Sequence, residues 1–317
     1  TTKIMTCIVA LENASPDEVV EISKRAASMP EVHMNAIRGE KYKIGDLLYA
    51  MMLESYNDVA VAVAEGVAGS VEEFAKLMNK KAGEIGAVNT NFVTPNGLDA
   101  KGHFSTAYDM ALIGAYAIKN QQFLKITNTK SYSFYDCNNK RHIVVNNKDA
   151  FLNMSSDAIG IKTGFTGDAG YCFVGAVKSN NRVYVSCVLA SGWPPNKTYK
   201  WRDTTKLMDY GKNNFDTKKI LKNRISFPVN IENGTKKQII AVAIGPYKAL
   251  VSKNDTVEAK TEFNYELPIR SGEKIGEVKL YINNQCVKKC KIEAVDSVEK
   301  YDFKYCFKKT LDYFIFQ

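Results

Sequence analysis

Two lysines in this 317-residue sequence stand where an amine could do chemistry. Lys3 opens the apolar run Ile4 to Leu11, which predicts a buried helix. Burial lowers the pKa of a lysine, so a buried Lys3 would hold a neutral amine able to accept a proton from a hydroxyl. Lys162-Thr163-Gly164 combines a cation with a hydroxyl donor, which suits a carboxylate. Ser55-Tyr56-Asn57 supplies a further hydroxyl and an amide.

Each group alone has an ordinary structural interpretation. A lysine on a helix is most often solvated, and chance places Lys-Thr-Gly in a chain of this length at roughly the few per cent level. Ser-x-Asn arises about once by chance. Ser179-Asn180-Asn181 is a second match, and its composition is typical of a hairpin turn. Only the three groups together, on the elements that carry them, indicate a site.

Composition and charge narrow the class of protein. The 317 residues, 45% of them hydrophobic, can bury a core and favour one large and one small domain. Seven cysteines without a CxxC pair and three scattered histidines exclude a disulfide scaffold and give no metal-site spacing. We therefore expect no metal and no cofactor. No apolar run approaches the ~20 residues that cross a bilayer.

The net charge of +9 is uneven, because residues 216–317 carry +6 and residues 1–215 carry +3. The basic residues of 216–317 alternate with apolar residues instead of clustering with aromatic ones. This pattern argues against nucleic acid and favours an anionic membrane or cell-wall surface.

Helical signals fill the first half of the chain. The sequence Ser15-Pro16-Asp17-Glu18 has the composition of a helix start and predicts a helix to about Ala27. Helical periodicity also covers residues 46–53 and 58–65. The break between these two helices presents the Ser-Tyr-Asn group in a loop.

Strand signals begin near residue 158. Residues 158–165, 171–177 and 182–190 predict an antiparallel meander, which carries Lys162-Thr163-Gly164 on its first strand. A helix over about residues 202–212 follows. Residues 1–215 are thus predicted to form an α+β domain with helices packed on an antiparallel sheet.

After Phe215 the chain changes to short strands separated by turn residues, so residues 216–298 predict a small all-β sandwich domain. In residues 299–317, apolar side chains alternate with Lys304, Lys308 and Lys309. This segment predicts an amphipathic tail helix at a membrane interface. A helix packed on the β-domain, or a disordered end, is the alternative.

The order of the three groups resembles the Ser-x-x-Lys, Ser-x-Asn and Lys-Thr-Gly motifs of the active-site-serine penicillin-binding proteins. Further stretches resemble the low-molecular-mass D-alanyl-D-alanine carboxypeptidases: Gly39-Glu40, residues 46–53, Asn96-Gly97-Leu98-Asp99, His103-Phe104-Ser105-Thr106-Ala107 and Ala169-Gly170-Tyr171-Cys172. The resemblance implies a transpeptidase domain of the penicillin-binding and β-lactamase type. It also implies a nucleophilic serine directly before Thr1, so we expect the sequence to be truncated at its N-terminus.

The resemblance assigns catalytic roles to three residues. Lys3 would act as the general base toward the expected serine, which lies about one helical turn away. Ser55 would relay a proton to the leaving amine, and Asn57 would orient the acyl amide or Lys3. His103 precedes a helix, and we expect it to make a structural hydrogen bond rather than to act as an acid or base.

The resemblance assigns substrate binding to the other lysine motif. Lys162 and Thr163 would bind the free carboxylate of the substrate, and Gly164 would let the substrate pair along the strand edge. The backbone N–H of Phe165 would complete an oxyanion hole with that of the serine. Arg202 is a candidate for a second carboxylate contact, or else a solvated arginine at a helix start.

These expectations describe a secreted serine peptidase that removes the terminal D-alanine of peptidoglycan stem peptides through an acyl-enzyme. Its expected partners are pentapeptides ending in D-Ala-D-Ala, β-lactam antibiotics and an anionic membrane surface, with no nucleic acid. Its expected location is extracytoplasmic, at the outer face of the bacterial cytoplasmic membrane. Two alternatives stay open: a β-lactamase or esterase of the same fold, and a non-catalytic cell-wall-binding protein. The β-lactamase is less favoured, because no Glu-x-x-Leu-Asn segment follows Ser55.

Overall fold

The computed structural model describes residues 1–315. The chain divides into two compact units, Thr1–Lys212 and Asn213–Gln317, which we call the N-terminal and C-terminal units. The last two residues, 316 and 317, lie outside the described residues.

The helices of the N-terminal unit pack around α1 (Lys3–Asn13), in which every residue from Lys3 to Ala10 is buried. A helix that is apolar on all sides belongs inside a core, as the sequence predicted. The helices that share this core are α3 (Ile44–Glu54), α4 (Asn57–Ala68), α5 (Val71–Ile85), α6 (Ala107–Ala117) and α7 (Gln121–Asn128). The predicted helices at 46–53 and 58–65 are therefore confirmed as α3 and α4.

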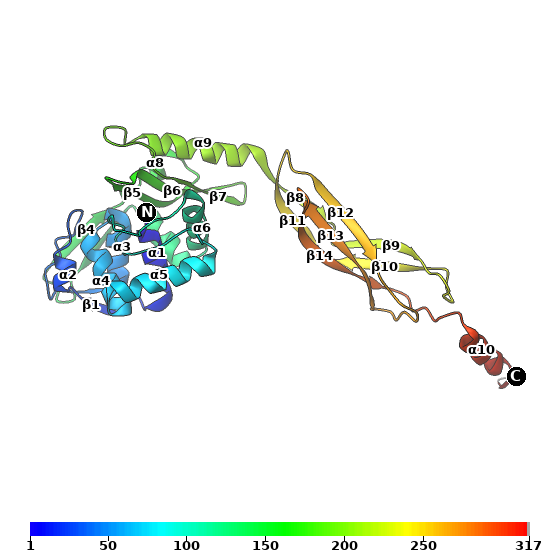
Figure 1. Ribbon diagram of the computed structural model, residues 1–317. Helices are drawn as coiled ribbons and strands as arrows, with labels where there is room; N and C mark the ends of the chain where they lie inside the picture. Colours follow the sequence, from blue (N-terminus) through cyan, green and yellow to red (C-terminus); the bar gives the residue numbers. More distant parts are fainter. Residues whose placement is uncertain (316–317) are drawn as a thin grey trace. The chain divides into compact units, whose positions relative to one another are not determined.

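A three-stranded antiparallel sheet lies against these helices (Figure 1). Its strands, in spatial order, are β5 (Ala158–Thr166), β6 (Gly170–Ser179) and β7 (Arg182–Val188). Alternate residues of β6 face opposite sides, so Val174 and Ala176 join the helical core. Phe173 and Val177 pack on the other side, with Phe151 of α8 (Phe151–Met154) and Met208 of α9 (Tyr199–Asn214).

The meander confirms the three predicted strands. Asn180 and Asn181 join β6 to β7 with positive φ angles of 51° and 59°. Two consecutive positive φ angles are typical of the tight turns that match the twist of a hairpin, and asparagine tolerates them. The strand β5 lies at one edge of the sheet, next to β6 alone.

The predicted helix from Ser15 to about Ala27 is wrong. Ser15 to Glu18 form a turn, and Val19–Glu21 form β1, which pairs with β2 (Lys41–Lys43). Helix appears only in α2 (Lys24–Ala27), capped by the side chain of Ser23. Pairing between two distant segments overrode the local helix-start signal. A further hairpin joins β3 (Ser131–Tyr135) to β4 (His142–Asn146).

The C-terminal unit is all-β apart from its last helix, as the sequence predicted. Its larger sheet has the order β12-β13-β14-β10-β9, and β8 pairs with β11 in a second sheet. Side chains of both sheets, among them Leu221 and Ile292, share one apolar core. The strands are β8 (Phe215–Leu221), β9 (Arg224–Asn230), β10 (Gln238–Ile244), β11 (Tyr247–Ser252), β12 (Val257–Phe263), β13 (Lys274–Ile282) and β14 (Gln285–Ala294).

The tail forms α10 (Phe303–Ile315), a helix without any buried residue. Its large apolar side chains are open to solvent, with Phe303 at 83% and Phe314 at 75% exposure. Residues 316 and 317 of the predicted tail lie outside the described residues. Within residues 1–315, no helix is both long enough and apolar enough to span a bilayer.

Candidate active site

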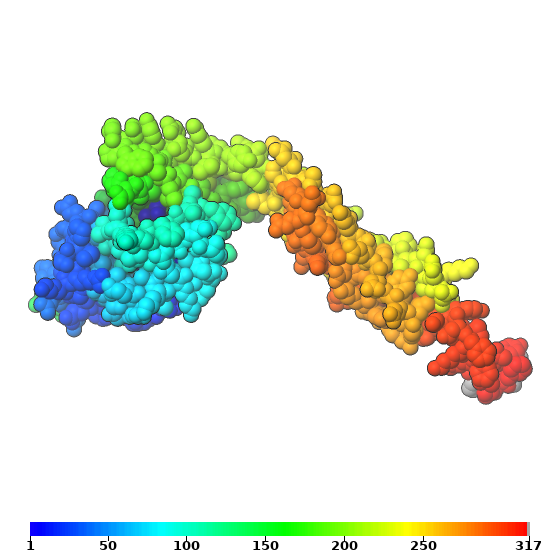
Figure 2. Space-filling view, in the orientation of Figure 1, coloured from blue at the N-terminus to red at the C-terminus, as the bar shows by residue number. Residues whose placement is uncertain are grey.

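A cleft of about 820 Å³ lies in the N-terminal unit. Figure 2 shows the first residues of the chain, in the deepest blue, at the bottom of a hollow between the helical part and the sheet. Five of the predicted site residues line this cleft: Lys3, Ser55, Asn57, Gly164 and Phe165. Residues far apart in the sequence, on α1, around the start of α4 and on β5, thus meet in one place.

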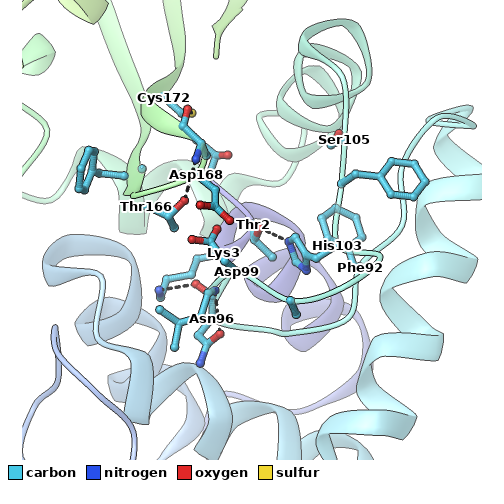
Figure 3. Close-up of a pocket in the computed structure, with 18 of the residues that line it drawn as sticks. Thr2, Lys3, Phe92, Asn96, Asp99, His103, Ser105, Thr166, Asp168 and Cys172 are labelled. Carbon is cyan, nitrogen blue, oxygen red and sulfur yellow. Dashed lines mark hydrogen bonds between the residues drawn. The ribbon is translucent and has the colours of Figure 1, made fainter. Parts of the chain in front are cut away.

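Lys3 is fixed by two oxygen atoms. Its Nζ donates to Asn57 Oδ1 at 2.8 Å and to the backbone carbonyl of Asn96 at 2.7 Å. Figure 3 shows Lys3 beside Asn96. Burial, followed by the positive charge of Lys162, places the pKa of Lys3 well below its usual value, while Asp58 opposes this effect. A neutral amine has two N–H donors and one lone pair. With both donors engaged by these oxygens, the lone pair is free to accept a proton from a third direction.

Asn57 begins α4 and is itself held in place. Its Nδ2 donates to the carbonyl oxygens of Pro30 and Glu31 at 3.2 and 3.1 Å, and this leaves Oδ1 directed at Lys3. Ser55 is the C-cap of α3, in the left-handed region with φ of 73°. This backbone turn ends α3 and places Ser55 on the wall of the cleft.

At Gly164 the strand wall of the cleft lies close to the residues just before α1. A Cβ atom on Gly164 would lie 2.5 Å from the backbone nitrogen of Thr1, so only glycine fits here without displacing one of the two walls. Phe165 follows, half-exposed, with its ring 4.6 Å from that of Tyr171. Thr163 is half-buried on β5 and lies outside the lining of the cleft.

Lys162 is buried beneath this wall, where two residues not predicted from the sequence contribute charge. Burial lowers the pKa of Lys162 to about 8, and the carboxylate of Asp149 raises it. Burial also raises the pKa of Asp149 to about 6. Asp149 Oδ1 accepts from the N–H of Phe151, while its buried Oδ2 has no hydrogen-bond partner within residues 1–315. Lys200 is buried above the rings of Tyr171 and Trp201.

Arg202 does not join the others. Its Nε donates to Asp203 Oδ1 at 3.0 Å, its guanidinium lies 4.3 Å from the ring centre of Tyr199, and its side chain is exposed. The buried cation of α9 is Lys200, two residues earlier, and its charge acts on Lys162. Asn96 was also not predicted as a site residue, although it lies in one of the stretches that carried the resemblance.

Residues 1–192 match the D-alanyl-D-alanine carboxypeptidase family of peptidases, which is more than half of the chain. The chain belongs to this family. Residues 215–300 match the C-terminal domain of penicillin-binding protein 5.

Curated and solved members of the carboxypeptidase family are similar over nearly the whole chain. The D-alanyl-D-alanine carboxypeptidase DacF of Bacillus subtilis is 30% identical, across 98% of this chain and 82% of the relative. The crystal structure of the carboxypeptidase DacD from Francisella tularensis has a TM-score of 0.74 at 25% identity, covering 94% of this chain and 87% of that one. The crystal structure of penicillin binding protein 5 from Haemophilus influenzae has a TM-score of 0.71 at 28% identity, covering 94% of this chain and 89% of that one.

Membership of the D-alanyl-D-alanine carboxypeptidase family confirms the resemblance that the motif order suggested. It confirms the predicted enzyme class, a serine-type carboxypeptidase, and the α+β domain followed by a small β-domain.

Proposed function

We propose that this chain releases the terminal D-alanine of peptidoglycan stem peptides by way of an acyl-enzyme, with Lys3 as the base and a serine directly before Thr1 as the nucleophile. The geometry of Lys3 is the observation that supports this most strongly. Its two acceptors occupy both N–H donors of a neutral amine. A residue three positions earlier lies on the same helix face, within reach of the lone pair.

The reaction proceeds in two halves. The serine oxygen bonds to the carbonyl carbon of the penultimate D-alanine while Lys3 takes the hydroxyl proton. The C–N bond then breaks, and the departing amine receives a proton that Ser55 relays from Lys3. In the second half, water attacks the ester carbon, Lys3 accepts its proton, and the serine oxygen leaves with a proton. Asn57 orients the amine of Lys3 throughout.

Binding of the substrate uses the strand wall. Because β5 is an edge strand, an extended peptide can pair with it as an added strand. Lys162 supplies positive potential for the terminal carboxylate, Lys200 adds to that potential, and Thr163 supplies a hydroxyl donor. The N–H of Phe165 and that of the serine stabilise the oxyanion.

Labelling with a fluorescent penicillin tests this function. The encoded protein, including the residue before Thr1, should carry covalent label on the peptide that contains Lys3. It should also release D-alanine from a pentapeptide ending in D-Ala-D-Ala. Label on another peptide, or absence of both label and D-alanine release, would refute the proposal. Rapid penicillin hydrolysis without D-alanine release would favour the β-lactamase alternative.

We also propose that α10 lies in the headgroup layer of an anionic membrane, which would hold the enzyme at the extracytoplasmic face. Its exposed aromatic side chains and its three lysines support this, since such helices combine apolar burial with attraction to anionic lipid. The intact protein should sediment with anionic vesicles at low salt and dissociate as salt rises. A chain ending at Val298 should stay in solution with its peptidase activity unchanged. Equal binding by that shorter chain would exclude α10 as the anchor.

A further inference from the structure

The ring of His103 links Thr2, just before α1, to the backbone of Val93 and Thr94. Its Nε2 lies 3.0 Å from Thr2 Oγ1 (Figure 3). Its Nδ1 accepts from the backbone N–H groups of Val93 at 3.1 Å and Thr94 at 3.3 Å. A backbone N–H can only donate, so Nδ1 must present its lone pair and the ring proton must sit on Nε2. His103 therefore donates to the Thr2 hydroxyl.

The segment that His103 holds is the 93–98 loop, and this loop lies directly on the first turns of α1. Thr6 Oγ1 donates to the carbonyl of Pro95 at 2.6 Å. Gly97 has φ of +77°, and a Cβ there would lie 2.8 Å from Thr2 Cβ. The loop can approach this closely because residue 97 has no side chain.

The loop also carries one of the two oxygens that fix Lys3. The carbonyl of Asn96 accepts from Lys3 Nζ at 2.7 Å, and Thr2 is the residue next to Lys3. His103 thus fastens the loop with Nδ1 and the start of α1 with Nε2, on either side of this hydrogen bond. Burial lowers the pKa of His103, which favours the neutral ring that this arrangement needs.

We infer that His103 is a positioning residue for Lys3, which fixes the Asn96 carbonyl against the lysine amine through its hydrogen bonds to Thr2 and to the 93–98 loop. This inference rests on the proposed role of Lys3 as the base. If the Asn96 carbonyl moves away, Lys3 loses one of its two acceptors and its lone pair no longer has a defined direction. A displacement near 1 Å in such a geometry costs up to about 10²-fold in rate.

Two substitutions remove the hydrogen bond between His103 Nε2 and Thr2, each from one of its two partners. His103→Asn keeps an acceptor near the position of Nδ1 and loses the donor to Thr2, while Thr2→Val removes the acceptor and leaves the histidine. In the encoded protein, each should lower the rate constant for penicillin acylation by roughly 10-fold or more, with the dissociation constant of the non-covalent complex unchanged. Thr2→Ser keeps the hydroxyl and should restore the rate. The double variant should be little slower than either single one, since both remove the same hydrogen bond.

His142→Asn is the matched control. His142 is exposed on β4, so this variant should be acylated at the wild-type rate. Wild-type rates in both His103→Asn and Thr2→Val would overturn the inference, as would equal losses in rate and binding. Nitrogen NMR of the histidine ring tests the geometry without any activity measurement. A proton on Nδ1 would overturn only the inference about His103 and leave the proposed function standing. A wild-type protein that no penicillin acylates would contradict the proposed function.

Discussion

Two buried lysines differ in their surroundings: Lys3 lines the cleft on its helical wall, and Lys162 lies on β5 beneath its strand wall. Lys3, on the helical wall, is fixed by the side-chain amide oxygen of Asn57 and the backbone carbonyl oxygen of Asn96. The carboxylate of Asp58, whose charge raises the pKa of Lys3, accepts hydrogen bonds from the backbone N–H groups of Met34, Ala36 and Val59. Lys162, beneath the strand wall, is under the charge of the Asp149 carboxylate, whose Oδ2 has no hydrogen-bond partner among the described residues.

The difference teaches how one residue type can be set to two charge states. Amide oxygens hold an amine in place while adding no net charge, so burial dominates and Lys3 tends to the neutral form. A carboxylate opposes the effect of burial, so Lys162 keeps its proton up to about pH 8. These surroundings agree with the proposed roles, proton transfer for Lys3 and anion binding for Lys162.

The largest effect is expected from removing the lysine of the helical wall. Lys3→Ala should lower the rate of penicillin acylation by about 10² to 10⁴, the contribution of general acid–base catalysis. Stopped-flow fluorescence would measure this rate. Lys119→Ala, at an exposed position, is the control and should behave as wild type. A Lys3→Ala protein that acylates normally would show that the base lies elsewhere.

Gly164→Ala should force the two walls apart. The added Cβ would meet the Thr1 nitrogen at 2.5 Å, so β5 or the start of α1 must move and acylation should fall by about 10²-fold. Gly167→Ala is the matched control, since nothing lies within 4 Å of the added atom. Similar rates for the two alanine variants would mean that the close approach at Gly164 has no role.

Thr163→Val tests the proposed binding of the substrate carboxylate alone. It removes a hydroxyl donor and keeps the shape, and an unmatched carboxylate costs ~1 to 3 kcal/mol, or roughly 5-fold to 150-fold in kcat/KM. The loss should appear with a peptide that has a terminal carboxylate and should be absent with an ester that lacks one. Equal losses on both substrates would place Thr163 in folding or in the chemical step.

Asp149→Asn should change the pH dependence more than the maximum rate. In the proposed role Lys162 binds the substrate carboxylate while protonated, so kcat/KM for a peptide with a terminal carboxylate should fall as the pH rises through about 8. Removing the charge of Asp149 lowers the pKa of Lys162 further, because the remaining neighbour Lys200 lowers it and the Coulombic effect of Glu54 that opposes this is smaller. The alkaline limb of the profile should then shift to lower pH. An unchanged limb would separate Asp149 from the charge of Lys162.

The sequence predicted the site to the extent that its residues lie in continuous motifs. Lys3, Ser55, Asn57 and Gly164 meet in the cleft because the helices and strands that carry them follow clear hydrophobic periods. Arg202 was predicted from its place at the helix start and from the family resemblance, and neither identifies Lys200 as the buried cation. Side chains two positions apart on a helix point about 200° apart around its axis. The packing of α9 against Tyr171 therefore decides which of the two cations is buried.

The remaining site residues depend on loops. The charge of Asp149 acts on Lys162 from the segment before α8, and the Asn96 carbonyl accepts from Lys3 because the 93–98 loop packs on α1. Neither approach has a local signal in the sequence, since a backbone carbonyl carries no side-chain identity. The failed helix at Ser15 has the same origin, in the distant pairing of β1 with β2.

At position 55, the residue that would best stabilise the fold differs from the residue that the proposed reaction needs. The helices α4 and α5 end on Gly69 and Gly86 in the left-handed region, and α3 ends in that region on Ser55, where a side chain costs roughly 1 to 2 kcal/mol. Selection for thermal resistance alone would therefore favour glycine at position 55. Such a protein would withstand more heat and lack the hydroxyl proposed to return a proton to the departing D-alanine, so the serine is expected to persist only where catalysis is under selection.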